Sequence, residues 1–287
     1  MDFSPLLERA LAQAEGRHIP TVTEVGQRTI QRPPRNYLDA ILLAKRADLG
    51  LETLKLTGAL QEILPEIHPL VGFGGGKEGH KDLWEHVKQV VVQTPGVSHL
   101  RWTALFHDVG KVRCFKREEG KVSFHGHEVA SARIWGKFCH RTAWFSSPFA
   151  SRVGFLIGHL GHIESYESSW TDSAVRRLNL EVGDNFADLV ALSRADMTTA
   201  DPRKRAKNQQ RIDELVGRVQ DLSREAARPK PRKGLGLELG EALGLTPGPA
   251  LGRVMKTLTE AIQTGELAPD APIKEYLSWL VLKSKKE

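Results

Sequence analysis

Apolar residues recur every three or four positions through most of the chain, and glycine or proline separates one apolar segment from the next. The alternation of apolar and polar residues that marks a β-strand is almost absent. A turn at Glu118–Lys121 favours one small hairpin within residues 111–125. The fold class that this pattern predicts is all-α.

The same spacing predicts where the helices lie. Residues 35–65 contain two or three short helices, and a glycine-rich stretch at 72–79 is expected to be a loop. Ser98 and Gly110 suit the N-cap and the C-cap of one helix. The remaining predicted helices span residues 81–94, 98–110, 126–141, 148–160, 172–182, 184–199, 203–226, 237–243 and 248–264.

Composition bounds the class of protein. The 287 residues are 40% hydrophobic and 26% charged, which is typical of one large globular domain or two modest ones. No run approaches the ~20 apolar residues of a membrane helix, so no membrane partner is expected. The early acidic residues Asp2, Glu8 and Glu15 are unlike a signal peptide, and Cys114 and Cys139 are too few for a disulfide framework. We expect a cytoplasmic protein.

Positive charge is concentrated in one segment. Residues 203–233 contain eleven Lys and Arg but four Asp and Glu, so their local charge of about +7 exceeds the net charge of +6 of the whole chain. A basic strip on a near-neutral body suggests a polyanionic partner, most commonly nucleic acid. A solvated helix followed by a basic linker is an equally open interpretation. The candidate nucleic-acid contacts are Arg203, Lys204, Arg205, Lys207 and Arg211.

Several ionisable residues occupy positions that a core helix would fill with apolar side chains. His86 flanks an apolar stripe, His107 and Asp108 lie inside the apolar run 102–109, and Asp196 shares a helix face with Leu189. Burying such groups without partners costs several kcal/mol, so we expect them to share partners. A hydrogen-bonded core histidine is the commoner reason for any one of them. One divalent ion would satisfy the whole set, and these donors suit Mn, Fe, Ni, Co or Zn, or Mg with added waters.

Neighbouring positions restrict how such an ion could be held. The side chains of His107 and Asp108 point about 100° apart on a helix, so both reach one ion only near a helix end. We expect Gly110 to provide that end.

The order of these residues resembles the HD-domain metal-dependent phosphohydrolases. The pattern is His86, then His107-Asp108, His127-Glu128, His159 and finally Asp196. Residues 80–135 (HKDLWEHVKQVV…LRWTALFHDVGK…FHGHEVASARIW) look like the HD domain of bacterial tRNA nucleotidyltransferases, the CCA-adding enzymes. The similarity continues in the segments 56–66, 170–177, 193–196 and 245–252, so that it covers roughly residues 35–284.

This resemblance implies an HD-domain helical bundle with neck-like helices before it and a small helical tail after it. The expected boundaries are an unassigned arm at 1–34, a neck-like segment at 35–79, the HD domain at 80–227, a basic proline-containing linker at 228–236 and the tail at 237–287. The family's nucleotide-adding head has no counterpart in the sequence. Gly74-Gly75-Gly76-Lys77 is followed by no paired carboxylates and is not a P-loop. We therefore expect no CCA addition.

The resemblance also implies roles for individual residues. His86, His107, Asp108 and Asp196 would hold one ion, and His127 and His159 would hold a second that Asp108 bridges. His127 has the alternative of starting a helix and bonding a backbone carbonyl, and His162 competes with His159. Asp108 and Lys111 are the expected catalytic residues. The expected substrate contacts are Lys111, His125, His162 and Arg194, although Arg194 could instead pair with a carboxylate. Glu128 would orient a ligand or remain an exposed residue.

The function that the resemblance implies is hydrolysis of the 2′,3′-cyclic phosphate or 2′-phosphate of nucleotides or RNA ends, tRNA among them, by a metal-activated water. One alternative is a hydrolase of other nucleoside mono- or triphosphates. Another is a non-catalytic tRNA- or RNA-binding module that partners a separate nucleotidyltransferase. The sequence predicts neither the metal nor whether one or two ions bind, and it predicts no oligomeric state.

Overall fold

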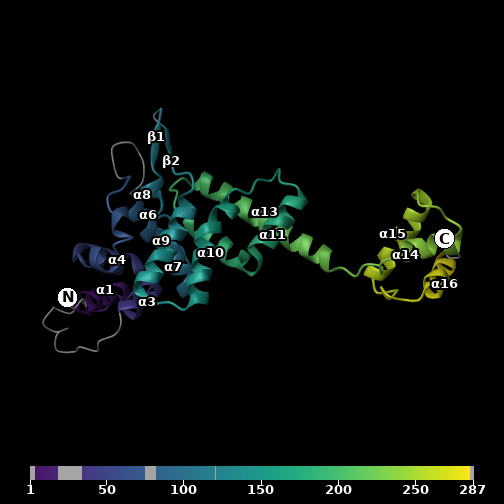
Figure 1. Ribbon diagram of the computed structural model, residues 1–287, viewed down its shortest axis with the longest axis horizontal. Coiled ribbons are helices and arrows are strands. Elements are labelled where there is room, and N and C mark those ends of the chain that lie inside the picture. The colour runs from purple at the N-terminus through teal and green to yellow at the C-terminus, as the bar shows by residue number, and fades with distance from the viewer. Residues whose placement is uncertain (1–3, 19–33, 75–81, 120, 285–287) are drawn as a thin grey trace. The chain divides into compact units, whose positions relative to one another are not determined.

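The computed structural model describes residues 4–18, 34–74, 82–119 and 121–284, and these are almost entirely helical (Figure 1). The predicted all-α class is confirmed. The predicted hairpin is present, since β1 (Lys116–Glu118) pairs antiparallel with β2 (Lys121–Ser123). Most of the predicted arm, residues 75–79 of the predicted loop and the predicted helix start at Lys81 lie outside the described residues.

Contacts divide the chain into two compact units, Met1–Arg218 (unit 1) and Val219–Glu287 (unit 2). The division falls inside helix α13 (Pro202–Ala227), and the predicted linker at 228–236 follows directly after that helix. Unit 1 begins with helices α1 (Ser4–Glu15), α3 (Pro34–Leu43), α4 (Ala47–Leu56), α5 (Ala59–Ile63) and the 3₁₀ helix η1 (His68–Leu70). It continues with α6 (Leu83–Gln93), α7 (Ser98–Phe106), α8 (Lys111–Cys114), α9 (His127–Thr142), α10 (Ser147–Glu164), α11 (Asp172–Val182), η2 (Gly183–Asn185) and α12 (Phe186–Asp196).

Most predicted helices are confirmed, and 172–182 agrees with α11 at both ends. Among the described residues, the α-helices α1, α8 and α16 (Ile273–Ser284) were not predicted. Helix α1 packs against α3 and α4. Its close approach to α4 depends on Gly50, where an added Cβ would lie 2.8 Å from the Cβ of Ala14 and 2.9 Å from the carbonyl oxygen of Ala10. The first part of the unassigned arm is thus a packed helix.

An aromatic cluster joins α7 to α9. Trp102 and Phe106 of α7 contact Trp135 and Phe138 of α9, with ring centroids 5.0 to 6.0 Å apart. All four residues are fully buried. Because large aromatic side chains contribute strongly to core stability, this cluster holds the end of α7 firmly against α9. The residues that follow Phe106 are therefore held in place.

The remaining helices of unit 1 surround this end of α7. Helix α10 packs against α7, α9 and α12, and α6 packs against α4, α7 and α12. The arrangement brings the middle of α6, the end of α7, the start of α9 and the end of α12 to one place.

Unit 2 contains α14 (Leu235–Leu243), α15 (Pro249–Gln263) and α16. Its core is apolar, with Leu239, Leu258, Ile262 and Tyr276 almost completely buried. The Tyr276 hydroxyl donates a hydrogen bond to the carbonyl oxygen of Ala268, 2.7 Å away. This bond gives the only polar atom of the Tyr276 side chain a partner.

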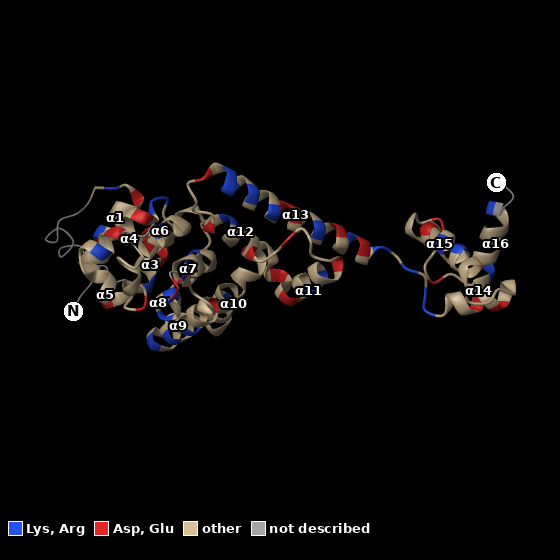
Figure 2. Cartoon of the chain, turned by 90° about the horizontal axis from the view of Figure 1, so that it is seen from above, with Lys and Arg blue, Asp and Glu red and all other residues tan. Residues whose placement is uncertain are grey.

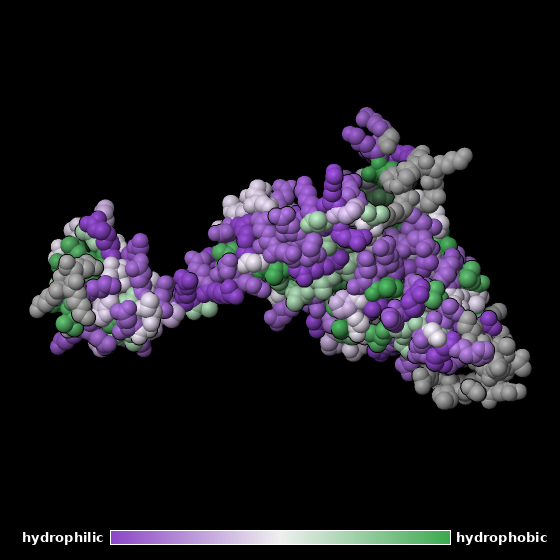
Figure 3. Space-filling model, turned by 180° about the vertical axis from the view of Figure 1, so that it is seen from behind, coloured by the Kyte–Doolittle hydropathy of each residue, from purple (hydrophilic) through white to green (hydrophobic). Residues whose placement is uncertain are grey.

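The surface is largely hydrophilic, and on the face seen in Figure 3 hydrophobic residues form small, scattered patches. The most exposed large apolar residues, among them Leu56 and Leu180, lie far apart in the sequence. Within the described residues, no helix combines the length and the apolar character that crossing a membrane would require.

Candidate metal centre

Three segments of unit 1 bring four ionisable side chains together. His86 lies one turn into α6, whose start is fixed by Asp82, since its carboxylate accepts a hydrogen bond from the backbone N–H of Trp84. His107 and Asp108 lie in the turn that follows α7, and Asp196 is the last residue of α12. The cluster therefore forms where helices end.

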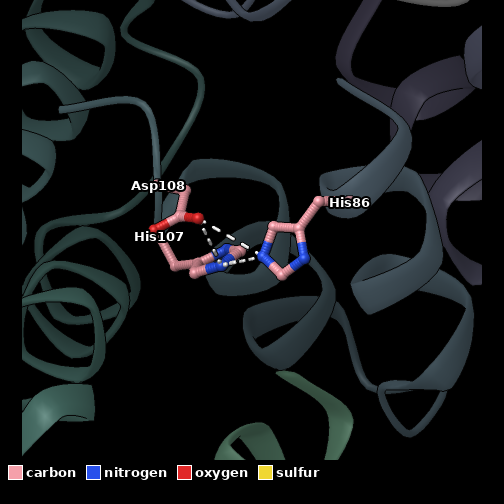
Figure 4. A group of neighbouring side chains, drawn as sticks. All are labelled: His86, His107 and Asp108. Carbon is pink, nitrogen blue, oxygen red and sulfur yellow. Dashed lines mark hydrogen bonds and ion pairs between the residues drawn. The ribbon is translucent and has the colours of Figure 1, made fainter. Parts of the chain in front are cut away.

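The four side chains point at one another. Figure 4 shows the imidazole of His86 facing both Asp108 and the ring of His107. The Nε2 atom of His86 is 3.0 Å from Oδ1 of Asp196, 3.3 Å from Oδ2 of Asp108 and 3.3 Å from Nε2 of His107. His107 Nε2 is 3.4 Å from each of the same two carboxylate oxygens. Each imidazole nitrogen thus lies within 3.4 Å of one oxygen from each carboxylate, and ligand atoms of His86, His107 and Asp108 all lie within 4.8 Å of one another.

Backbone carbonyls orient the histidines. His107 Nδ1 lies 2.8 Å from the carbonyl oxygen of Ala104, and His127 Nδ1 lies 3.1 Å from that of Phe124. A carbonyl oxygen only accepts hydrogen bonds, so each Nδ1 carries the proton and each neutral ring keeps a lone pair on Nε2. His86 Nδ1 pairs with the Thr198 hydroxyl at 2.9 Å. This is how proteins prepare histidines as metal ligands.

Without an ion, the imidazoles and the carboxylates of the cluster stabilise one another's charged forms. Burial lowers the pKa of His107, but the adjacent Asp108 and Asp196 outweigh burial and raise that pKa well above its usual value. Burial raises the pKa of Asp108, yet His107 and His86 bring it well below its usual range, and Asp196 is lowered in the same way. The side chains of His107 and Asp108 are only 4% and 1% exposed. Two imidazoles and two carboxylates therefore pair in the absence of solvent.

The donor set fits a divalent cation. Donors about 2.1 Å from one ion stand roughly 3.0 to 3.4 Å apart in octahedral or tetrahedral coordination, and the observed separations of 3.0 to 3.4 Å fall in that range. Oδ1 of Asp196 is buried and has no hydrogen-bond partner among the described residues. An orphaned carboxylate oxygen that faces two imidazole nitrogens is the environment that a cation would complete.

The second oxygen of Asp108 faces another group. Its Oδ1 is 3.5 Å from Nε2 of His127, while its Oδ2 faces the first cluster and accepts a hydrogen bond from Lys111 Nζ at 2.7 Å. Glu128 Oε2 lies 3.2 Å from His127 Nδ1, beside the Phe124 carbonyl. His127 starts α9 and its Nδ1 bonds a backbone carbonyl, as the sequence allowed, while its Nε2 faces Asp108 and its role as a ligand stays a prediction.

All of these ionisable side chains belong to one matched segment. Residues 81–221 match the family described as the HD domain. The chain contains an HD domain. The His and Asp cluster lies inside it and is consistent with the metal site of an HD-domain phosphohydrolase.

Two curated proteins are similar over most of the chain. The A-adding tRNA nucleotidyltransferase of Deinococcus radiodurans is 31% identical over 252 residues, which cover 85% of this chain and 57% of the relative. The CC-adding tRNA nucleotidyltransferase of Thermus thermophilus is 30% identical over 298 residues, which cover 94% of this chain and 62% of the relative. The chain thus spans less than two thirds of the length of either relative, and the homology is distant.

His159 and His162 lie in a second group of the HD domain. Both are on α10, and their ligand atoms and a carboxylate oxygen of Glu181 all lie within 4.8 Å of one another. His159 Nδ1 bonds the carbonyl oxygen of Phe155, which leaves its Nε2 with the lone pair. His162 Nδ1 is 3.5 Å from Glu181 Oε1. His159 and His162, the two competing candidates, therefore lie in the same group.

The other predicted contacts are spread over the HD domain. His125 is exposed in the loop that precedes α9. Arg194 donates a hydrogen bond to Asp213 at 2.6 Å, which is the carboxylate pairing that the sequence left open. Among the predicted nucleic-acid contacts, Arg205 bonds the carbonyl oxygen of Thr199. The first turns of α13 expose the four residues Arg203, Lys204, Arg205 and Lys207, whereas Arg211 is half-buried.

The predicted caps of α7 were wrong. Val97, not Ser98, is the N-cap, and the helix ends at Phe106, so that His107–Gly110 form a turn. Gly110 has a φ of −69°, which any residue adopts, and it is the N-cap of α8. A Cβ at Gly110 would lie 2.3 Å from the carbonyl oxygen of His127. Glycine is therefore needed here for close packing against α9 and not to stop a helix.

Two site residues were missed by sequence reasoning. Thr198 holds His86 Nδ1, and Glu164 hydrogen-bonds Asp196 from the end of α10. Desolvation and the Asp196 carboxylate raise the pKa of Glu164 to about 8, although the residue keeps exposed surface. Neither had a signal in the sequence, because a Thr after a helix and a Glu at a helix end are ordinary surface residues.

Proposed function

We propose that the HD domain of this chain hydrolyses the 2′,3′-cyclic phosphate or the 2′-phosphate of a nucleotide or an RNA end. The observation that carries this proposal is that His86 and His107 each face one oxygen of Asp108 and one of Asp196, while Asp196 Oδ1 has no hydrogen-bond partner among the described residues. These four residues would hold one divalent ion, and His127 with His159 would contribute to a second. The candidate ions are Mn, Ni, Co, Fe, Mg and Zn.

A divalent ion bound there lowers the pKa of a water molecule from ~16 toward ~7 and so supplies hydroxide at neutral pH. Hydrolysis of the cyclic ester forms one bond from the water oxygen to phosphorus and breaks one bond from phosphorus to a ribose oxygen. The released ribose oxygen takes up a proton and becomes a hydroxyl group. Asp108 would contribute a ligand to both ions, since its Oδ2 faces His86 and its Oδ1 faces His127.

Lys111 lies between the cluster and solvent. Its ammonium group is 2.7 Å from Asp108 Oδ2, and its side chain is 22% exposed. Burial lowers the pKa of Lys111, but the Asp108 carboxylate outweighs burial and raises it, so the side chain stays cationic. We assign to Lys111 the neutralisation of a phosphate oxygen of the substrate. His125 and His162 are proposed as further substrate contacts, and Arg194 is not, because Asp213 already engages it.

Aromatic side chains beside Lys111 support a nucleotide substrate. The Phe124 ring centroid is 5.8 Å from Lys111 Nζ, and the Phe115 ring is 6.0 Å from that of Phe124. Phe115 is 43% exposed, although large aromatic residues are usually buried. Exposed aromatic faces stack on nucleobases of any sequence. We propose that the base next to the reactive phosphate stacks here.

The RNA-end assignment draws on the relatives, both of which are named for acting on tRNA. We infer that this chain shares an RNA ligand with them, and we place its activity in the cytoplasm.

RNA binding by itself is the second candidate function. The first turn of α13 contains Arg203, Lys204 and Arg205 and no acidic residue, although the positive end of a helix dipole disfavours cations. Because these three cations lie at the end of the helix where the dipole disfavours them, they favour a polyanionic ligand. In this alternative, a neck-like segment (35–79) and a tail (237–287) would contribute tRNA contacts, and a separate nucleotidyltransferase would be the partner.

The deciding experiment is hydrolysis of 2′,3′-cyclic AMP by protein stripped with EDTA and then titrated with Mn, Ni, Co or Mg. We expect turnover that requires a metal. No turnover on the cyclic nucleotide or on 2′-AMP, together with release of phosphate from other nucleoside mono- or triphosphates, would replace the proposed substrate. No turnover with any nucleotide, together with tRNA binding, would favour the binding module.

The binding role of α13 is separable from hydrolysis. Lys204→Glu with Lys207→Glu should weaken tRNA binding and lower its salt dependence, because two phosphate contacts are lost. Hydrolysis of 2′,3′-cyclic AMP should not change, since Lys204 and Lys207 are exposed and neither belongs to the candidate metal centre. Equal loss of both activities would contradict this separation.

A further inference from the structure

The outer face of α8 and α9 contains a hollow of about 630 Å³ that the proposed reaction does not use. Four of its lining residues are basic or imidazole side chains, Arg113, Arg133, Lys137 and His140, and its apolar floor includes Ala130 and Ile134. We call these six residues the α9 groove. No acidic residue lines this hollow. Figure 2 shows Lys and Arg gathered on α8 and α9, on a side of unit 1 away from the basic first turns of α13.

These cations are not used to hold the fold together. Within the part of the chain that the structure describes, Arg113, Arg133 and Lys137 form no ion pair, and all three are exposed. Arg141, one residue beyond the groove, behaves differently, because it forms two hydrogen bonds with Glu66 at 2.9 and 2.8 Å. The contrast shows that salt-bridge partners are available nearby and that the groove does not contain one.

The spacing of the groove residues lines them up. Arg133, Lys137 and His140 are separated by four and three positions on α9, so they share one face and span about 10 Å along the axis. Like charges four residues apart destabilise a helix. The helix dipole favours cations in the last turn, but Arg133 and Lys137 lie in the middle of α9 and gain little from it.

The groove begins at the metal centre. Helix α8 carries Lys111, which bonds Asp108, and two residues later Arg113, which lines the groove. Helix α9 starts at His127, whose Nε2 faces Asp108, and Ala130 lies one turn further along. His127 and Ala130 are three residues apart and share a face of α9, so a chain of phosphates whose last member sits in the metal centre would reach Arg133 and Lys137 along α9.

We propose that the α9 groove binds the sugar–phosphate backbone of an RNA strand whose terminal phosphate lies in the metal centre. This inference rests on the proposed function and extends it, because it makes an oligoribonucleotide and not a mononucleotide the preferred substrate. The cations contact phosphates, and Ala130 with Ile134 contact the apolar edges of ribose. Recognition is independent of base sequence, since nothing in the groove reads base edges.

The test compares two substrates of the full-length protein. One is 2′,3′-cyclic AMP, and the other is a ten-nucleotide RNA that ends in a 2′,3′-cyclic phosphate. Arg133→Glu with Lys137→Glu should raise KM for the RNA at least about tenfold and leave kcat/KM for 2′,3′-cyclic AMP within about twofold. The matched control is Arg177→Glu on α11, an exposed arginine outside the groove, which should leave both substrates unchanged.

A binding measurement separates this inference from the hydrolase proposal. Fluorescence anisotropy of the same RNA with a terminal 3′-phosphate, recorded in EDTA, needs neither metal nor turnover. The double variant should lower the slope of log affinity against log salt by about 1.4, since each lost single-strand phosphate contact contributes about 0.7. Arg133→Gln with Lys137→Gln should give the same loss of slope and a weaker loss of affinity, which excludes misfolding.

Unchanged RNA affinity and unchanged salt slope in both double variants would overturn the inference, and so would an equal loss of activity on the two substrates. An acidic protein that binds wild type but not the double variants, with RNA binding unaffected, would overturn it as well. If wild type hydrolyses no cyclic phosphate but its RNA binding depends on Arg133 and Lys137, the hydrolase proposal fails and the groove stands as an RNA site.

Discussion

The core of unit 2 is built from aliphatic side chains and one tyrosine, whereas the core of unit 1 also contains charged side chains. In unit 2, residues such as Leu239, Leu258 and Ile262 are buried without any ionisable neighbour in the core. In unit 1, His107 and Asp108 are as buried as those leucines. Unpaired burial of ionisable groups costs several kcal/mol. Unit 1 therefore buries ionisable groups that need partners, and the candidate site is one place where it does so.

Buried charge alone does not identify a site, as Lys88 in the same unit shows. Its ammonium group pairs with Glu52 at 2.6 Å and with Glu85 at 2.8 Å, and Glu52 also accepts a hydrogen bond from Trp84. These partners satisfy each other, and they join α4 to α6. The cluster around Asp108 differs because Asp196 Oδ1 is left without a hydrogen-bond partner. The other buried side-chain atoms without a hydrogen-bond partner among the described residues are guanidinium nitrogens, so it is the carboxylate oxygen facing two imidazole nitrogens that points to a cation.

The largest expected effect comes from removing the Asp108 carboxylate, whose oxygens face His86 and His107 on one side and His127 on the other. Asp108→Ala should lower the turnover of 2′,3′-cyclic AMP at least about a thousandfold, because it removes the oxygens directed at His86, His107 and His127. Its RNA affinity, measured by anisotropy, should stay within about twofold of wild type.

The matched control for Asp108→Ala is His99→Gln, in a His–Asp pair outside the cluster. His99 Nε2 bonds Asp188 at 2.7 Å. This variant should keep its turnover. Loss of RNA binding by Asp108→Ala to the same degree as turnover would show that catalysis and binding are not separate.

A core substitution in unit 2 tests whether that unit is purely structural. Leu258→Ala empties a fully buried position and should destabilise unit 2 by about 2–5 kcal/mol. Hydrogen exchange should then show faster exchange in residues 235–284, while unit 1 keeps its protection and its kcat/KM for 2′,3′-cyclic AMP. A comparable loss of that activity would mean that unit 2 supports the reaction.

A single methyl group added at Gly110 should disturb the contact between the start of α8 and α9, the helices that carry Lys111 and His127. The added Cβ would lie 2.3 Å from the carbonyl oxygen of His127 and 2.7 Å from the backbone nitrogen of Ser131, and backbone atoms cannot move aside easily. Gly110→Ala should lower the free energy of unfolding by about 1–3 kcal/mol, measured by urea denaturation. Turnover should fall too, since α8 and α9 carry Lys111 and His127. Unchanged stability would show that the two segments are not in tight contact.

Metal affinity should rise with pH. The pKa of His107 is raised in the folded, metal-free protein, so its ion pairs add stability below about pH 6.5 and lose it as the pH rises through the folded value. The lowered pKa of Asp108 adds stability above about pH 4, which is lost as the pH falls through its folded value. The metal-free cluster is therefore most stabilising between these limits.

Binding of a cation requires neutral His107 and so releases a proton. Below the pKa of His107, affinity for Mn should increase about tenfold per pH unit if one proton is released. Calorimetry in two buffers with different ionisation enthalpies measures the released protons directly. An affinity that does not change with pH would show that His107 is not a ligand.

The smallest effect is expected at a second glycine of the same unit. Gly136 lies on the exposed side of α9, and a Cβ there would meet no atom within 4 Å. Gly136→Ala should stabilise the protein by about 0.5–1 kcal/mol, because alanine loses less backbone entropy than glycine in a helix. A destabilisation like that of Gly110→Ala would mean that α9 is less exposed than the structure shows.

Much of the fold was predictable, because helical periodicity is a local property of three to four residues. Helix α11 has the predicted ends, the short helices α4 and α5 lie within the predicted 35–65 segment, and α3 begins one residue before it. Helix α1 packs on α4, but it was not predicted, because its own residues do not indicate which helix it packs against. The mistaken C-cap at Gly110 has the same origin, since the atom that demands glycine belongs to His127.

The sequence by itself determined that the chain is helical, and it determined which histidines and aspartates are out of place among apolar neighbours. Only the tertiary structure decided that Asp108 divides its two oxygens between different histidines, that Thr198 holds His86, and that Asp196 Oδ1 has no partner. The reason is physical. A helix forms from interactions within one turn, whereas a cation site forms from side chains that meet only when distant helix ends pack together.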